Sequence, residues 1–112
     1  MAKFGTYPSG SVLGSFISIT ATSSGGAQTL HTAALEGRQR VRLDAWNNST
    51  SDVVLTIQWA GTAAADEIKM TIPALGGPVS VSPDWTLLNG KAVKAYAGTT
   101  AVIGVKVELD DE

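Results

Sequence analysis

The stretch QRVRLDAWNNSTSDVVLTIQWA, residues 39–60, holds two runs in which every second residue is apolar. The first run covers 39–46 and the second covers 53–60, with the polar sequence NNSTSD between them. Successive side chains of a β-strand point to opposite faces, so this pattern predicts two strands that each bury one face. The Asn-rich and Ser-rich connection is typical of a turn.

Similar alternation continues through the rest of the chain. It is regular in the runs 67–72 and 101–109 and weaker in the runs 12–21, 27–33, 78–82 and 91–97. Gly, Pro and Asn residues separate most of these runs. About eight short strands at such intervals are typical of a sandwich or barrel. We therefore predict an all-β fold, an antiparallel β-sandwich that is jelly-roll-like in topology, with an immunoglobulin-like sandwich as the alternative.

A chain of 112 residues is expected to form one domain. We divide it into an N-terminal arm (1–11), the sandwich domain (12–109) and an acidic tail (110–112). Alternation predicts the following core residues: Phe16, Val41, Leu43, Val53, Leu55, Ile57, Trp59, Ile68, Met70, Ile72, Val79, Val81, Val93, Ile103, Val105 and Val107.

The composition excludes several classes of protein. Charged residues make up 16% of the chain, the net charge is −2 and there is no Cys, so a disulfide framework, a zinc ribbon and a cysteine nucleophile are excluded. The mild acidity disfavours nucleic acid as a partner, because phosphates attract basic surfaces. No apolar run approaches the roughly 20 residues of a membrane span, and we expect neither a membrane partner nor a signal peptide.

The sequence offers little for catalysis. His31 is the single histidine, whereas a transition-metal site needs two or more His or Cys ligands. It lies in a Thr-rich run without a nucleophile elbow, so a half-buried structural histidine is expected. The glycine-rich segments lack the lysine and helix of a phosphate-binding loop. We expect no catalytic residue, no cofactor and no metal site.

Paired carboxylates are the harder case for a catalytic site, since acids from different loops can converge in space. Most of the candidates fall in turns, where Asp is favoured for its hydrogen bonds to the backbone. The acids considered are Asp44, Asp52, Asp66, Glu67 and Asp84.

One candidate contact surface is a row of same-parity residues in the run 39–46 and just before it. Arg38, Arg40 and Arg42 share the face opposite the core, and Asp44 and Trp46 continue the row. A solvated strand face, or protection of an edge strand by charge, is one interpretation. A docking ridge is the other, because Arg and Trp are enriched at binding hot spots.

The two chain ends supply further candidates. The arm contains Phe4 and Tyr7, which either belong to a loosely packed terminus or anchor the arm on a neighbouring subunit. Lys3 is the only charged residue before Glu36, so protein–protein contact is expected chiefly in the N-terminal third. The final residues ELDDE form either a solubilising terminus or a contact to a basic surface.

Aromatic residues suggest one binding function of a different class. Trp46, Trp85 and Tyr96 could form a platform for a sugar ring, as in carbohydrate-binding modules on β-sandwiches, if the fold brings them together. Trp59 is excluded from such a platform, because its parity places it in the core with Ile57.

An ordered set of segments resembles a group of small virion proteins of tailed bacteriophages. These proteins share an Asn-rich turn, a VxLTIxW-Gly strand, a TIPA strand and a late Asn-Gly hairpin. The matching segments are QTLHTA (28–33), VRLDAWNNSTSDVVLTIQWAGT (41–62), IKMTIPALGG (68–77), LLNGKAVKAYAGT (87–99) and VIGVKV (102–107). The arm and the acidic tail lie outside the resemblance.

The resemblance implies a β-sandwich structural subunit without catalysis. Our first expectation is a capsid decoration, or cement, protein that lies on the capsid surface of the virion, forms a homotrimer and binds the major capsid protein. A neck, tail or fibre-associated position is the alternative within this class. The expected interface residues are Phe4 and Tyr7 in the arm, together with Arg38, Arg40, Arg42 and Trp46 in the row.

Overall fold

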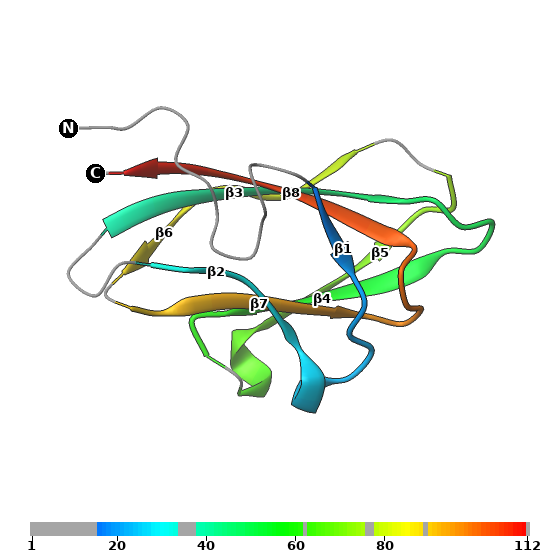
Figure 1. The fold of residues 1–112 in the computed structure, drawn as a ribbon, viewed down its shortest axis with the longest axis horizontal. Helices are drawn as coiled ribbons and strands as arrows, with labels where there is room; N and C mark the ends of the chain where they lie inside the picture. The colour runs from blue at the N-terminus through cyan, green and yellow to red at the C-terminus, as the bar shows by residue number, and fades with distance from the viewer. Residues whose placement is uncertain (1–15, 34–37, 62, 76–77, 89, 112) are drawn as a thin grey trace.

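The computed structural model consists of two four-stranded antiparallel sheets that pack face to face (Figure 1). It describes residues 16–33, 38–61, 63–75, 78–88 and 90–111. Two single-turn 3-10 helices are the only helical elements in these residues. The predicted all-β sandwich is confirmed.

Each of the eight expected strands has a counterpart, although only the run 67–72 matches at both ends. The elements in chain order are β1 (Ile17–Ile19), η1 (Ser24–Gly26), β2 (Gln28–Thr32), β3 (Arg38–Asn47), β4 (Val53–Trp59), η2 (Ala64–Asp66), β5 (Glu67–Ile72), β6 (Val79–Leu88), β7 (Ala92–Ala97) and β8 (Ile103–Asp111). Strand β8 thus includes Asp110 and Asp111, which the sequence division assigned to a tail.

The strand order identifies the topology. One sheet has the order β1-β8-β3-β6 and the other β2-β7-β4-β5, and we call them the 1-8-3-6 sheet and the 2-7-4-5 sheet. Strands β1 and β8, β2 and β7, β3 and β6, and β4 and β5 pair with each other. This nested pairing is that of a long antiparallel ribbon folded over on itself, which is a jelly roll. The immunoglobulin-like alternative is excluded, because it would place the first two strands side by side in one sheet.

The core lies between the sheets and follows from the alternation in the sequence. In β3, Val41, Leu43 and Ala45 are fully buried, and in β4 Leu55 and Ile57 face them from the other sheet. Buried aliphatic side chains of β8 and β7 complete the centre. Predicted core residues that are only partly buried are Trp59, Ile68, Met70 and Val79.

The predicted burial of Phe16 is wrong. Its side chain is 65% exposed, while Ile17 and Ile19 are buried. The pairing of β1 with β8 places Ile17 opposite Val105 and Ile19 opposite Ile103, both core residues. Because a strand buries one parity only, Phe16 lies on the outer face.

Strand β6 is longer than the run 78–82 that the sequence predicted, and it continues through Pro83. It tolerates the proline because it lies at the edge of its sheet, where a missing N–H need not leave a ladder bond unmade. The pairing with β3 also shifts here, since Val41 lies opposite Trp85 but Leu43 lies opposite Ser82. This irregularity is a β-bulge, which accommodates the proline.

Asn47 holds the corner at which the chain leaves the 1-8-3-6 sheet for the other sheet. Its side chain is buried, and its Nδ2 donates to the carbonyl oxygens of Ser51 (2.8 Å) and Ile72 (3.0 Å). Its Oδ1 accepts from the backbone N–H and from the hydroxyl of Ser49, both at 2.8 Å. The buried amide is therefore satisfied at both ends and ties the corner to the end of β5.

Replacing Asn47 should destabilise the fold strongly. We expect Asn47→Leu to lower the free energy of unfolding by about 2–4 kcal/mol, because buried carbonyl groups lose their donors. Asn47→Asp keeps the shape but turns a carboxylate toward two carbonyl oxygens, so it should be comparably destabilising. Urea unfolding measures both, with Asn48→Ala, at the exposed neighbour, as the control. Unfolding midpoints equal to the parent would contradict this role.

Candidate functional site

The outer face of the 1-8-3-6 sheet carries the predicted row of residues. Strand β3 presents Arg40, Arg42 and Trp46 away from the core, as expected from their parity. Arg38 begins the strand opposite Leu88, and its side chain is outside the described part. Phe4 and Tyr7 also lie outside the described residues. Whether this face binds a partner stays a prediction.

The pairing of β3 with β8 changes the chemical character of the row. Arg42 lies opposite Glu108 and Asp44 lies opposite Lys106, so each charge faces its opposite across the two strands. Along the strands, Arg42 Nε is 4.0 Å from Asp44 Oδ2, and Lys106 Nζ is 3.3 Å from Glu108 Oε1. Opposite charges at facing positions stabilise a sheet and cancel its field. This face is therefore charge-compensated, not a basic ridge.

The row ends in an aromatic cluster. Trp46 lies opposite Gly104, and a Cβ added to this glycine would be 2.5 Å from the indole atoms Cε2 and Nε1. The indole thus occupies the space that any other residue at position 104 would fill. Phe16 packs against Trp46 edge to face, with ring centroids 4.7 Å apart and an interplanar angle of 77°. This arrangement is the favoured one for aromatic pairs.

A groove of about 210 Å³ opens beside the aromatic cluster. Phe16, Trp46 and Val102 provide apolar lining, and Ser18 and Asn48 provide polar lining. None of its lining residues is charged. Covering the exposed part of the Phe16 ring would be worth about 3 kcal/mol, because an aromatic side chain has roughly 200 Å² of surface at about 25 cal/mol per Å².

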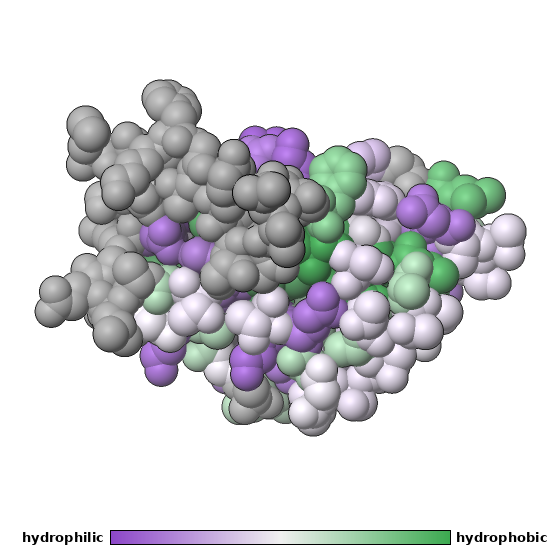
Figure 2. Space-filling view, in the orientation of Figure 1, coloured by the Kyte–Doolittle hydropathy of each residue, from purple (hydrophilic) through white to green (hydrophobic). Residues whose placement is uncertain are grey.

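Apolar surface is dispersed on the side of the molecule seen in Figure 2. Green areas of apolar side chains are separated by pale residues of intermediate hydropathy and by purple polar ones (Figure 2). Apolar side chains that are scattered singly over a protein surface are ordinary. Their spread suits contact at several points better than the deep burial of one ligand.

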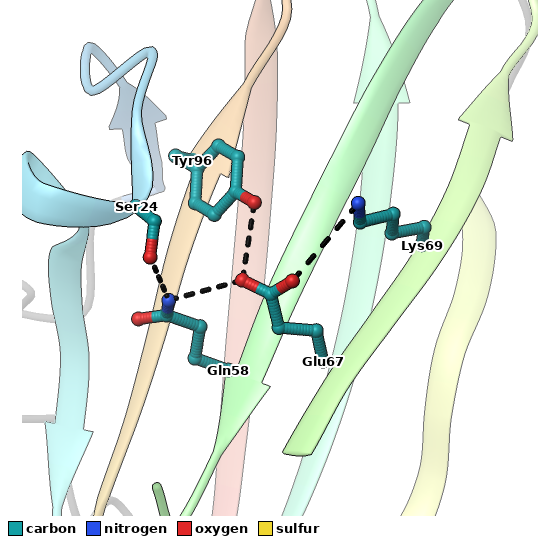
Figure 3. A network of polar contacts seen from close by, with 5 residues as sticks. All are labelled: Ser24, Gln58, Glu67, Lys69 and Tyr96. Carbon is teal, nitrogen blue, oxygen red and sulfur yellow. Dashed lines mark hydrogen bonds and ion pairs between the residues drawn. The ribbon is translucent and has the colours of Figure 1, made fainter. Parts of the chain in front are cut away.

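The outer face of the 2-7-4-5 sheet carries a polar network instead (Figure 3). Gln58 Nε2 donates to Ser24 Oγ (2.9 Å) and to Glu67 Oε2 (3.2 Å). The Tyr96 hydroxyl donates to the same carboxylate oxygen (3.1 Å), and Lys69 Nζ lies 4.0 Å from Glu67 Oε1. These side chains come from η1, β4, β5 and β7, so the network fastens the η1 turn over three strands.

Gln58 is the most buried member of this network and joins Ser24 to Glu67. It is 1% exposed although its parity places it on the outer face, because the surrounding side chains cover it. The carboxylate of Glu67 fixes the amide orientation, since a flipped amide would place oxygen against oxygen. The Oε1 atom of Gln58 has no hydrogen-bond partner among the described residues. Because these contacts join η1 to β4, β5 and β7, we call the network the clamp.

His31 is buried, deeper than the half-buried position expected. A bulge in the pairing of β2 with β7 lies between Thr29 and His31, and both Leu30 and His31 are buried as a result. The Nε2 atom of His31 lies 2.6 Å from Gln39 Oε1, so the two polar groups satisfy each other inside the sandwich.

The candidate acids whose side chains the structure describes do not converge, and the side chain of Asp84 is outside the described part. Asp52 Oδ1 accepts from the backbone N–H of Ala74 (2.9 Å), and Asp66 Oδ2 accepts from that of Ala63 (3.3 Å). Asp44 lies on the outer face of one sheet, whereas Glu67 belongs to the clamp on the other. Within the described residues, no three His, Cys, Asp or Glu side chains are placed to hold a metal ion together.

The described part of the chain has no helix with the length and apolar character that crossing a membrane requires.

The structure does not bring the proposed sugar platform together. Trp46 lies on the outer face of the 1-8-3-6 sheet, and Tyr96 belongs to the clamp on the other sheet. Trp85 lies opposite the buried Val41 and meets Trp59 edge to face, with centroids 5.4 Å apart. The three rings therefore occupy three separate places.

Phe16 and Gly104 are the residues of this site that sequence reasoning missed. The run 12–21 can be read in either phase, and the β-branched Ile17 and Ile19 were the available signal for the correct one. A glycine inside the regular strand 101–109 was a second signal, because it often marks a close approach by another group. Its partner Trp46 could not be named without the strand register.

A double-mutant cycle tests the contact between Trp46 and Gly104. Gly104→Ala should destabilise the parent by about 1–3 kcal/mol, because its Cβ collides with the indole. In a Trp46→Ala background the same change should be neutral or stabilising by up to about 1 kcal/mol, since alanine suits a strand better than glycine. Urea unfolding gives the coupling, expected to be at least about 1 kcal/mol. Gly98→Ala, whose Cβ would lie 3.9 Å from its nearest neighbour, is the matched control and should show no coupling.

The clamp is tested at Gln58. We expect Gln58→Leu to lower the free energy of unfolding by about 1–3 kcal/mol, because the partly buried Glu67 carboxylate and the Ser24 hydroxyl lose the Nε2 donor of a buried amide. Lys69→Met removes only the exposed ion pair to the same carboxylate and should cost less than about 0.5 kcal/mol. Equal effects in thermal or urea unfolding would contradict the central role of Gln58.

Comparison of the chain with protein-family models, with curated proteins and with solved structures gives no match. We therefore infer the function from the fold, from the outer faces of the two sheets and from the resemblance in the sequence.

Proposed function

We propose that the chain is a non-enzymatic structural protein of a tailed-phage virion, and specifically a capsid decoration protein. In this role it lies on the outer capsid shell as a homotrimer, binds the major capsid protein and bridges neighbouring capsomers. The ordered sequence segments support the class of protein, and the jelly roll agrees with the β-sandwich that the resemblance implies.

The observation that carries the proposal is the distribution of exposed large apolar side chains. They come from the edges and outer faces of both sheets and from a loop: Phe16, Val54, Leu75, Trp85 and Leu88. Charged residues make up only 16% of the chain, and those on the outer face of β3 and β8 lie opposite charges of the other sign. Such a surface can lie against several neighbours at once, which bridging requires.

Stabilisation of a shell would follow from mass action. A protein that binds the assembled shell and not the free subunits favours assembly by RT ln(1 + [L]/Kd) for each site. Many identical sites multiply a modest gain, so no single contact needs to be strong. The mechanism requires wide contact and no chemical step.

Two other functions remain as alternatives. A neck, tail or fibre-associated position uses the same adhesive surface at fewer copies per particle. A carbohydrate-binding module is the alternative from another class, and the Phe16–Trp46 groove is the place on the described surface where a sugar ring could stack.

The proposal is tested by measuring the content and the heat stability of phage particles produced with and without the chain. Purified particles should contain the chain at a fixed ratio to the major capsid protein. Particles produced without it should release their DNA at a lower temperature, and adding the purified chain should restore the parent value. Dye-accessible DNA during heating is the measurement, with heat-unfolded chain as the control.

Absence of the chain from particles, or equal heat stability with and without it, would contradict the decoration role. A few copies located at the neck or tail by electron microscopy would favour the first alternative. Saturable quenching of Trp46 fluorescence by a glycan, lost in Trp46→Ala, would favour the second.

A further inference from the structure

We propose that the Phe16–Trp46 groove receives the N-terminal segment of a second copy of the chain, with Phe4 or Tyr7 as the inserted ring. The association of the purified chain does not depend on its place in a virion. This inference can therefore fail while the proposed function holds, and the reverse is equally possible.

The size and chemistry of the groove suit an aromatic side chain. Its volume of about 210 Å³ has room for one ring, since a cavity of about 150 Å³ binds benzene. Phe16 and Trp46 already form an edge-to-face pair, and a third ring would extend that cluster. The open face of Phe16 is apolar surface that an insertion would remove from water.

The position and composition of the undescribed N-terminal segment point to it as the occupant. Fifteen residues precede Phe16, which itself lines the groove, and Lys3 is their only charge. Their two aromatic residues are Phe4 and Tyr7. The groove has no charged lining, whereas the neighbouring surface of β3 and β8 is densely charged. An almost uncharged segment therefore matches the groove and not the adjacent face.

The length of the segment favours insertion into another copy. Tyr7 lies nine positions before Phe16, which lines its own groove, and nine extended residues span about 30 Å. The shortest dimension of the molecule is 22 Å. The extended segment is therefore long enough for the Tyr7 ring to reach a neighbouring copy. To enter the groove of its own chain, the segment would have to reverse its direction. Each copy would then donate one segment and accept one, as a closed homotrimer requires.

Two full-length variants each alter one side of this contact, the segment or the groove. The segment variant carries Phe4→Ala and Tyr7→Ala, and the groove variant carries Phe16→Ala and Ser18→Glu. Both groove positions are exposed, so the fold should persist, as circular dichroism will verify. The matched control carries Leu75→Ala and Thr71→Glu, which make the same kinds of change at exposed positions away from the groove.

Light scattering after size exclusion measures the concentration at which half of the chain associates. We expect the segment and groove variants each to raise it at least about tenfold and the control to leave it unchanged. An equimolar mixture of the two variants should form a one-to-one dimer, because one intact segment then meets one intact groove while every other contact stays broken.

Three results would overturn the inference. They are a parent chain that stays monomeric at high concentration, a segment variant that associates like the parent, and a mixture that fails to associate.

Discussion

The pairing of β3 with β8 is the constraint on which the arrangement of the surfaces depends. It runs without interruption from Gln39 opposite Asp111 to Asn47 opposite Ile103. Because strand side chains alternate, a slip of one residue would turn the core residues of one strand outward. The same register places Trp46 over Gly104 and each outer charge opposite its counterpart.

The two outer faces differ because of what lies across each strand. In the 1-8-3-6 sheet, charges compensate one another until the row reaches Gly104, where the missing side chain admits an indole and leaves an apolar groove. In the 2-7-4-5 sheet, Gln58 and Glu67 close the surface with hydrogen bonds. The first face therefore carries an open apolar groove, whereas on the second face hydrogen-bonded side chains cover the part near η1 and leave Val54 exposed.

Local alternation in the sequence predicted the strands and most of the core, since the interior of a sandwich imposes a period of two. It failed where a residue's environment depends on a distant strand. Phe16 is the clearest case, because only its pairing with β8 decides which parity of the short β1 is buried. Pro83 ended the expected strand early, because its tolerance depends on the position of β6 at a sheet edge.

The candidate site could be predicted only in part for the same reason. The face of Trp46 followed from parity, and the charge compensation of the arginine row did not, since Glu108 and Lys106 are far away in the chain. The jelly roll was expected from strand number and spacing, although the nested pairing that proves it involves contacts between the two ends of the chain.

We propose that this protein associates through the outer face of the 1-8-3-6 sheet, and thiol labelling tests the proposal. The chain has no Cys, so a single cysteine can be introduced as Ser18→Cys beside the groove or as Thr71→Cys on the other sheet. Both positions are exposed in the isolated subunit. We expect labelling to slow on association at position 18 and not at position 71. Equal labelling at both positions, or protection at position 71 alone, would contradict it.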